Sequence, residues 1–310
     1  MAWIYHDIRF QKHETGIHPE SPERLKAIER RLNQTSLLEK FTRRGIVGAT
    51  WEQLRAVHGE EYLRSLADWE KRGGGQIEAD TVMSRESFSI AKLAAGTAIN
   101  AVDQVMSTQS EQAVCLIRPP GHHALVNRAM GFCLMNNVAI AAAWALNHHR
   151  LDRILMVDWD VHHGNGTQEL FYDSGRVHFF SAHRFPFYPG TGDSNETGRG
   201  EGLGATFNLP LKFGISRQEY LTRFESMLND AAKACRPQLV LVSAGYDAHR
   251  RDPIGSLGLE SEDFASLTRM VLGVANSYCR GRLVSLLEGG YDLSALAEGV
   301  EAHLATIRPE

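Results

Sequence analysis

The sequence predicts an α/β protein with one mostly parallel β-sheet covered by helices on both faces. Two observations carry this prediction. Short apolar runs with few polar residues alternate with long helical patterns along the 310 residues, and this alternation is typical of parallel strands that are buried on both faces. In addition, polar and glycine-rich segments directly follow several apolar runs, at the ends of strands where open α/β sheets bind their ligands.

The expected elements follow one another in a regular order. Residues 22–34 begin with Pro22 after Ser21, which is typical of a capped helix start, and Thr50 is placed to cap a second, short helix. The helical patterns predict further helices at 84–108, 134–149, 216–235, 261–278 and 293–307. The apolar runs predict strands at 113–117, 154–157, 177–180, 206–209, 239–242 and 283–287. No repeat or linker divides the chain, so we expect a single domain over residues 1–310.

Composition excludes several classes of protein. A hydrophobic fraction of 43% with 23% charged residues is ordinary for a globular chain, and the net charge of -4 argues against a nucleic-acid surface. No apolar run approaches the ~18 residues of a membrane span, and the N-terminal segment lacks the apolar core of a signal peptide. The four cysteines show no CxxC spacing, which favours buried, reduced thiols. We therefore expect a cytoplasmic protein.

Four of the predicted strands are followed at once by chemistry-bearing segments. These are RPPGHH after 113–117, DWDVHHGNG after 154–157, SAGYDAHRRDP after 239–242 and EGGY after 283–287. Because the carboxyl ends of parallel strands meet at one edge of the sheet, the four segments are expected to converge there.

The segment DWDVH predicts a metal site. Alternation along an extended chain puts Asp158, Asp160 and His162 on the same side. Asp160 and His162 are candidate ligands of one zinc ion, and Asp252, on a loop after another strand, is the candidate third ligand. Such a set leaves a position open for water, as in catalytic zinc sites, and it also accepts iron(II). The alternative is a buried polar or ion-paired cluster without metal, which the neighbouring His pair makes less favoured.

The adjacent residues His122 and His123 predict proton transfer, since imidazole near neutral pH accepts a proton from water and returns it to a leaving amine. Asp158 and Asn165 are candidate partners that fix the two rings.

Tyr291, after Gly289 and Gly290, carries a phenol that can donate to a developing oxyanion, while the glycines let the backbone approach closely. The segment 185–190 is interpreted equally well as a hydrophobic loop or as a channel wall. His58, His178 and His249 are expected to be structural, and His148 and His149 to be solvated.

Together these segments resemble the histone deacetylase superfamily. RPPGHHA, GFCLMNNVAIA, VDWDVHHGNGTQ, VSAGYDAHRRDP and LEGGY occur in that order, and the similarity, which runs from about residue 18 to residue 291, is to the class II-like branch. That branch includes bacterial deacetylase-like amidohydrolases and acetylpolyamine amidohydrolases. The resemblance implies one arginase-like domain with an eight-stranded sheet, and zinc-dependent hydrolysis of an acetylated amine that releases acetate.

The resemblance also assigns roles. It implies zinc ligands at Asp160, His162 and Asp252, a general base at His123 beside His122, and a carbonyl-polarising phenol at Tyr291. It implies tunnel walls at Phe132 and Tyr188, with Gly131 beside the substrate amide and Gly289 and Gly290 also binding substrate. It further implies a monovalent-cation site, usually potassium, next to Asp158. Two positions depart from common patterns: Asn165 stands where class I enzymes carry Asp, and Tyr188 stands where Phe is common.

Two other functions are compatible with the pattern. A binuclear manganese ureohydrolase on the same architecture would need more bridging carboxylates than the 247–252 segment offers. A non-catalytic acetyl-amine binding protein would have no need to retain every proposed catalytic group. The substrate is an acetylated amine in either a peptide or a small molecule. The sequence does not distinguish acetyl-lysine from acetylpolyamines, and it gives no indication of oligomeric state.

Overall fold

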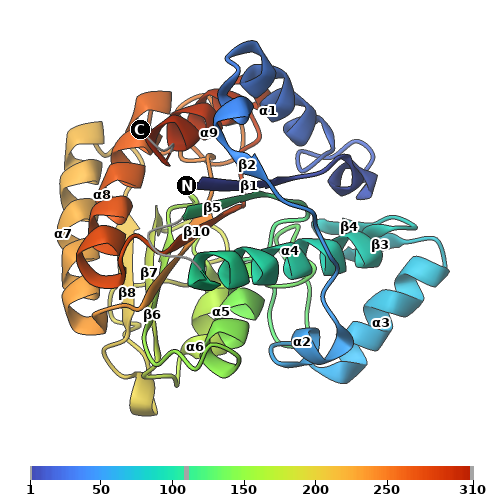
Figure 1. Cartoon of the computed structure of the whole chain (residues 1–310), viewed down its shortest axis with the longest axis horizontal. Coiled ribbons are helices and arrows are strands. Elements are labelled where there is room, and N and C mark those ends of the chain that lie inside the picture. The colour runs from blue at the N-terminus through green and yellow to red at the C-terminus, as the bar shows by residue number, and fades with distance from the viewer. Residues whose placement is uncertain (1, 108–111, 308–310) are drawn as a thin grey trace.

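The computed structural model describes residues 2–107 and 112–307 and is built around one eight-stranded sheet (Figure 1). The strand order is β2-β1-β5-β10-β9-β6-β7-β8, and every pairing within it is parallel. The strands are β1 (Ala2–His6), β2 (Thr42–Arg43), β5 (Gln112–Leu116), β6 (Ile154–Asp158), β7 (Val177–Arg184), β8 (Thr206–Leu211), β9 (Leu239–Ala244) and β10 (Leu283–Leu287).

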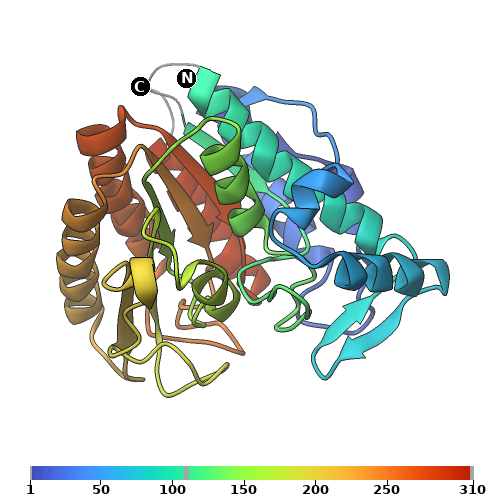
Figure 2. The ribbon, with the colours of Figure 1, turned by 90° about the horizontal axis from the view of Figure 1, so that it is seen from below.

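Helices cover both faces of this sheet (Figures 1 and 2). One face is covered by α1 (Glu23–Gln34), α7 (Arg217–Cys235), α8 (Ser261–Cys279) and α9 (Leu293–Ile307), and the other by α4 (Ser87–Ser107), α5 (Asn137–Asn147) and α6 (Asn165–Phe171). The central strands β6, β9 and β10 are buried along their whole length. Their apolar sequences therefore reflect contact with helices on both sides.

A smaller lobe packs beside α4. It contains α2 (Trp51–Arg55), α3 (Glu60–Lys71) and the antiparallel hairpin of β3 (Gly75–Glu78) and β4 (Thr81–Met83), and it shares a second hydrophobic cluster with α4 and α5. Short 3-10 helices occur at Ile8–Lys12, Leu37–Lys40 and Gly200–Gly202. Within the described residues, the helices are all too short or too polar to span a lipid bilayer.

The predicted strands and helices are all present, with shifted ends. The helix expected over 134–149 begins only at Asn137, because the side chain of Asn136 caps it by accepting a hydrogen bond from the backbone N–H of Ala139. Thr50 does cap α2, in a reciprocal arrangement with Gln53. Several elements that the sequence did not predict complete the fold: strand β1, the edge strand β2, helices α3 and α6, and the β3–β4 hairpin.

The sheet order explains where function can lie. The four strands followed by chemistry-bearing segments, β5, β10, β9 and β6, are consecutive neighbours in the sheet. Since they are parallel, their carboxyl ends lie along one edge, and the predicted convergence of the four segments is confirmed.

Candidate active site

Two histidines with different partners stand at the end of β5. The Nδ1 atom of His122 lies 2.9 Å from Oδ2 of Asp158, the last residue of β6, and both side chains are buried. Burial opposes a charged ring, but the carboxylates of Asp158 and Asp160 prevail and hold the pKa of His122 well above its ordinary value. His122 is therefore an imidazolium that is paired with Asp158.

His123 has a neutral partner instead. Its Nδ1 lies 2.6 Å from Oδ1 of Asn165, the first residue of α6. Burial lowers the pKa of His123 well below its ordinary value, and the neighbouring rings of His122 and His162 add to this effect. With the amide oxygen accepting from Nδ1–H, the other ring nitrogen, Nε2, is left unprotonated. His123 is thus placed to accept a proton.

Three buried side chains form a potential metal site next to this pair. Ligand atoms of Asp160, His162 and Asp247 all lie within 4.8 Å of one another. The Nδ1 atom of His162 is 3.0 Å from Oδ1 of Asp160 and 3.2 Å from Oδ2 of Asp247. Two carboxylates and one imidazole are a donor set that suits catalytic zinc.

The protein environment of this group fits a cation. Oδ2 of Asp247 is buried and makes no well-directed hydrogen bond, whereas Oδ1 accepts from the backbone N–H of Val161. Burial, with the charge of Asp160 next, raises the pKa of Asp247 to about 7. Since two buried carboxylates repel each other, a metal ion between them would compensate their charge.

Asp252, the third ligand expected from the sequence, is not among these closely spaced atoms. It lies near them, since its charge is one of the influences, after burial and Asp160, that raise the pKa of Asp247. Its Oδ1 accepts hydrogen bonds from the backbone N–H groups of Ile254 and Gly255, both at 2.9 Å. Its Oδ2 accepts from Tyr291 at 2.7 Å and from Asp292 at 3.4 Å. Asp252 therefore joins its own loop to the loop of Tyr291. Asp160 also accepts backbone hydrogen bonds on both of its oxygens, so such bonds do not exclude Asp252 as a metal ligand.

Tyr291 lies beside the metal-site group on the loop after β10. Burial raises the pKa of its phenol well above the ordinary value, and the carboxylates of Asp247 and Asp160 add to that shift. The hydroxyl therefore stays protonated and can donate. Gly289 allows this packing: a Cβ there would lie 2.2 Å from Oδ2 of Asp247 and 2.5 Å from Oδ2 of Asp160.

Buried ion pairs hold the Tyr291 loop from behind. The guanidinium of Arg24 donates to the backbone oxygens of Gly290 and Glu288. Arg24 is paired with the carboxylate of Glu20, which also accepts hydrogen bonds from Arg118, and all three side chains are fully buried. These residues were not predicted, because their contacts join segments far apart in the chain.

A further buried carboxylate supports the His122 loop. Glu288 accepts hydrogen bonds from the backbone N–H groups of Gly121 and His122 and from the hydroxyl of Ser243. Burial raises the pKa of Glu288 to about 7. The residue is part of the LEGGY motif, but its position behind His122 was not predicted.

A cavity of about 220 Å³ leads to these groups. Of the residues expected to form the tunnel, Gly131, Phe132 and Tyr188 line it, whereas Gly289 and Gly290 are not among its lining residues. The segment 185–190 is a channel wall in part, since Phe187 stacks on His162 with ring centroids 5.3 Å apart. The complete lining is Asp80, His123, Gly131, Phe132, His162, Phe187, Tyr188, Ile254 and Tyr291.

Gly131 is required for the shape of this tunnel. It has a positive φ of 56°, and a Cβ there would lie 2.3 Å from the ring of His123. Its backbone N–H and that of Phe132 donate to Asp80 and Thr81 of the β3–β4 hairpin. The small lobe thus contributes Asp80 to the tunnel mouth, a residue that the sequence did not single out.

The other histidines and the cysteines have structural surroundings. His58 is buried and contacts the backbone oxygen of Leu125 through Nδ1, and the N–H of Asn136 donates to its Nε2. All four cysteines are buried and none forms a disulfide. His148 and His149 differ from the expectation that they are merely solvated, because His149 contacts the carboxylate of Asp103.

Comparison with known proteins gives a consistent result. The family pattern described as "Histone deacetylase domain" matches residues 18–307. A "Probable deacetylase" of Archaeoglobus fulgidus is 39% identical over 94% of this chain and 81% of its own length. The "Histone deacetylase-like amidohydrolase" of Pseudomonas aeruginosa is 37% identical over 88% of this chain and 72% of its own.

Two further similarities concern larger proteins and structure. The human "Polyamine deacetylase HDAC10" is 42% identical over 96% of this chain, which corresponds to 46% of the human protein. The solved structure "Crystal Structure of HDA15 HD domain" superposes with a TM-score of 0.93 at 33% sequence identity, covering 99% of this chain and 87% of that one.

Proposed function

Because the chain belongs to the histone deacetylase family, we propose that it hydrolyses the acetyl amide of an acetylated amine and releases acetate, with zinc as its cofactor. One observation carries the proposal. At the end of a single cavity, a neutral histidine, His123, and a protonated phenol, Tyr291, stand beside the buried group of Asp160, His162 and Asp247.

We propose Asp160 and His162 as metal ligands, with the third carboxylate supplied by Asp252, as expected from the sequence, or by the neighbouring Asp247. The buried Oδ2 of Asp247, which lies 3.2 Å from Nδ1 of His162, and the crowding of two carboxylates support a divalent cation there. When bound, Zn²⁺ would supply Lewis-acid polarisation of the amide carbonyl and lower the pKa of a coordinated water. The same donors accept Fe²⁺. The resemblance further implies a potassium ion near Asp158, which we retain as part of the proposal.

His123 is the proposed general base. Asn165 keeps its Nδ1 protonated and directs the unprotonated Nε2 toward the cavity that His123 lines. A water that attacks the amide carbon loses a proton to this nitrogen. Because Asn165 is uncharged, it stabilises the resulting imidazolium less than a carboxylate would, and the proton is readily passed to the departing amine.

His122 and Asp158 are proposed to position and polarise the pair. The ring of His122 stays charged beside Asp158, and its centroid lies 4.0 Å from that of His123. A fixed positive charge at this place favours the negative charge that develops on the substrate as water adds.

Tyr291 is proposed to donate its phenolic proton as a hydrogen bond to the oxyanion of the tetrahedral intermediate. Removal of a single donor of this kind typically costs ~2.7–4 kcal/mol of transition-state stabilisation. The raised pKa of the phenol supports the role, since a phenolate could not donate.

The cavity wall supports a narrow, linear substrate. Phe132, Phe187, Tyr188 and Ile254 enclose it, and Asp80 is the one carboxylate among its lining residues. Aromatic side chains on opposite walls suit an aliphatic chain that carries the acetyl amide at its tip. We propose acetyl-lysine or an acetylpolyamine as the substrate class.

Acetate release tests the proposal. Zinc-loaded protein is incubated with an acetyl-lysine peptide, acetylputrescine and acetylspermidine, with Tyr291→Phe as the matched control. Turnover of the peptide identifies a lysine deacetylase, and a strong preference for the small amines identifies a polyamine amidohydrolase. Absence of acetate release from all three substrates, at every metal loading, would refute the proposed reaction.

A further inference from the structure

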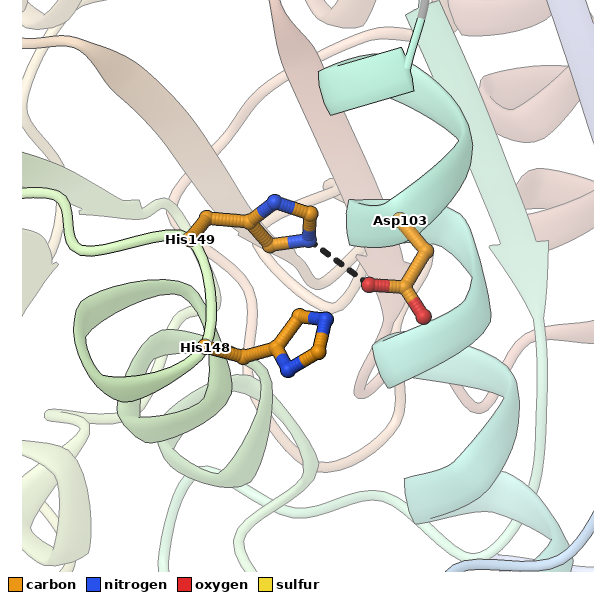
Figure 3. Close-up of side chains that lie close together, drawn as sticks. All are labelled: Asp103, His148 and His149. Atoms are coloured by element: carbon orange, nitrogen blue, oxygen red, sulfur yellow. Dashed lines mark hydrogen bonds and ion pairs between the residues drawn. The ribbon is translucent and has the colours of Figure 1, made fainter.

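A second cluster of metal-binding side chains lies far from the cavity, where α5 ends against α4. His148 and His149 follow the last residue of α5, and Asp103 projects from the carboxyl-terminal part of α4. Ligand atoms of the three side chains lie within 4.8 Å of one another. Figure 3 shows both imidazole rings on the same side of the Asp103 carboxylate.

The carboxylate is held in place by its neighbours. Oδ1 of Asp103 accepts a hydrogen bond from the indole N–H of Trp144 at 2.7 Å, and Nε2 of His149 lies at the same distance from that oxygen. His149 is its only ion-pair partner among the described residues. The second carboxylate oxygen, Oδ2, takes part in neither contact, so it remains available to a ligand.

The imidazole rings of His148 and His149 are also held in fixed orientations. His148 stacks on Trp144 with centroids 4.2 Å apart and planes inclined by 11°. The ring of His149 stands almost perpendicular to that of His148, at 5.0 Å. Trp144 therefore fixes the carboxylate through its N–H and one imidazole through its face, which reduces the entropy that a bound ion would cost.

The cluster is accessible from solvent. The side chains of His149 and Asp103 are 21% and 43% exposed, and a surface pocket formed by α2 and α5 reaches Trp144 and His148. An ion could enter without any rearrangement of the core. The proposed catalytic group is different in this respect, since its three side chains are buried.

We propose that Asp103, His148 and His149 form a surface site for a divalent transition-metal ion, with Zn²⁺ as its natural occupant. Two imidazoles and one carboxylate are borderline donors that prefer this class of ion to Mg²⁺ or Ca²⁺. Binding replaces the contact between His149 and Asp103 with bonds from both side chains to the ion, and solvent fills the remaining coordination position. The ion would join the end of α5 to α4.

Helix α5 connects this cluster to the loop of the candidate active site. At its amino-terminal end, Asn137 donates from Nδ2 to the backbone oxygen of Pro119, in the loop that carries His122 and His123. At the other end lies the metal cluster. The 11 residues of α5 span about 16 Å, so the two sites do not share ligands.

Equilibrium dialysis of the holoenzyme, its catalytic group already filled with zinc, tests the proposal. Zn²⁺ alone is the probe, and bound zinc per chain is counted by elemental analysis. We expect a second zinc in the wild type and at least about tenfold weaker binding of it in His149→Gln and Asp103→Asn. Asp152→Asn is the control, because it removes an exposed carboxylate that is not part of the cluster. This variant should bind the second zinc as the wild type does.

His148→Gln tests whether zinc can be lost without unfolding, because the His148 side chain makes only ring contacts with Trp144 and His149. It should retain full acetate-releasing activity and lose the second zinc. Cu²⁺, which quenches nearby indoles, should reduce the fluorescence of the wild type more than that of Trp144→Phe. A wild type that binds one zinc only, or second-site affinity unchanged in all three ligand variants, would overturn the proposal.

Discussion

The backbone N–H of Tyr291 donates to Oδ2 of Asp252 at 2.7 Å, so the residue expected to be the third metal ligand also holds the loop that carries the phenol. Asp252 lies on the loop after β9 and Tyr291 on the loop after β10, two neighbouring strands. The position of the proposed oxyanion donor therefore depends on a carboxylate that need not touch the substrate.

Asp252 and Asp247 should respond differently to the same substitution. Asp247→Asn is expected to weaken zinc binding by at least about 100-fold, because it removes a proposed ligand. If Asp247 is the third ligand, Asp252→Asn should retain zinc but reduce kcat by about one to two orders of magnitude, because weaker hydrogen bonds to four amides loosen the Tyr291 loop. Zinc content and turnover of both variants check this. Loss of zinc from Asp252→Asn alone would instead identify Asp252 as the third ligand.

Tyr291→Phe should keep zinc and lose about two or more orders of magnitude in kcat, since the phenol is the proposed donor to the oxyanion. Tyr188→Phe is the matched control, because Tyr188 also lines the cavity but has no proposed role in the chemical step. It should alter KM more than kcat. Equal kcat losses in the two variants would contradict the role given to Tyr291.

Gly289→Ala should reduce zinc affinity by at least about tenfold. The added Cβ would come within 2.5 Å of carboxylate oxygens of both Asp160 and Asp247 and push them apart. Gly273→Ala, in α8, is the control because a Cβ there meets nothing within 4 Å. That variant should bind zinc normally and be more stable by roughly 1 kcal/mol. Chelator competition measures the affinities, and normal zinc binding by Gly289→Ala would refute the packing argument.

The buried cluster of Glu20 predicts acid sensitivity. Burial opposes its ionisation, yet Arg118 holds the pKa of Glu20 well below its ordinary value of 4.5. A carboxylate with a lowered pKa stabilises the fold fully above that ordinary value. The contribution is lost as pH falls from there through the pKa in the folded protein, since the unfolded chain binds the proton more readily.

Glu20→Gln should therefore destabilise the protein by about 3–5 kcal/mol at neutral pH, because Arg118 and Arg24 are left buried without a counter-charge. The variant should also show a shallower loss of stability below the ordinary glutamate pKa. Urea unfolding across pH 3–7 measures both effects. Glu301→Gln is the control, because it removes a surface ion pair with Arg31 and should lower the free energy of unfolding by less than about 1 kcal/mol. An equally small loss in Glu20→Gln would contradict the stabilising role given to the buried Glu20 cluster.

The central part of the fold could be predicted because burial on both faces leaves a clear mark on a strand. The run at 239–242 is apolar throughout, and β9 is indeed buried along its length. The two strands on one side of the sheet, β1 and β2, were harder to predict. β2 has only two residues, both exposed, and β1 gains its place by pairing with β2 and β5. Such pairing is decided by tertiary contacts, which a local pattern does not contain.

In the candidate site, too, features marked by a local pattern could be predicted and features that depend on tertiary contacts could not. The partners of His122 and His123 could be predicted, since Asp158 and Asn165 flank a neighbouring motif. The position of Asp247 beside Asp160 and His162 could not be predicted, because it depends on the path of the loop after β9. The ion pair of Glu20 with Arg118 joins residues 98 positions apart, and nothing in either local sequence indicates the other.

The origin of the cavity wall has a consequence for how substrate range can change. The groups proposed to perform the chemistry end four central strands, whereas Phe132, Phe187 and Ile254 belong to connecting segments that line the approach. Replacement of one wall residue alters width or polarity without moving a strand. The architecture thus separates recognition from reaction, so that related chains can diverge in the amines they accept while the reacting groups stay in place.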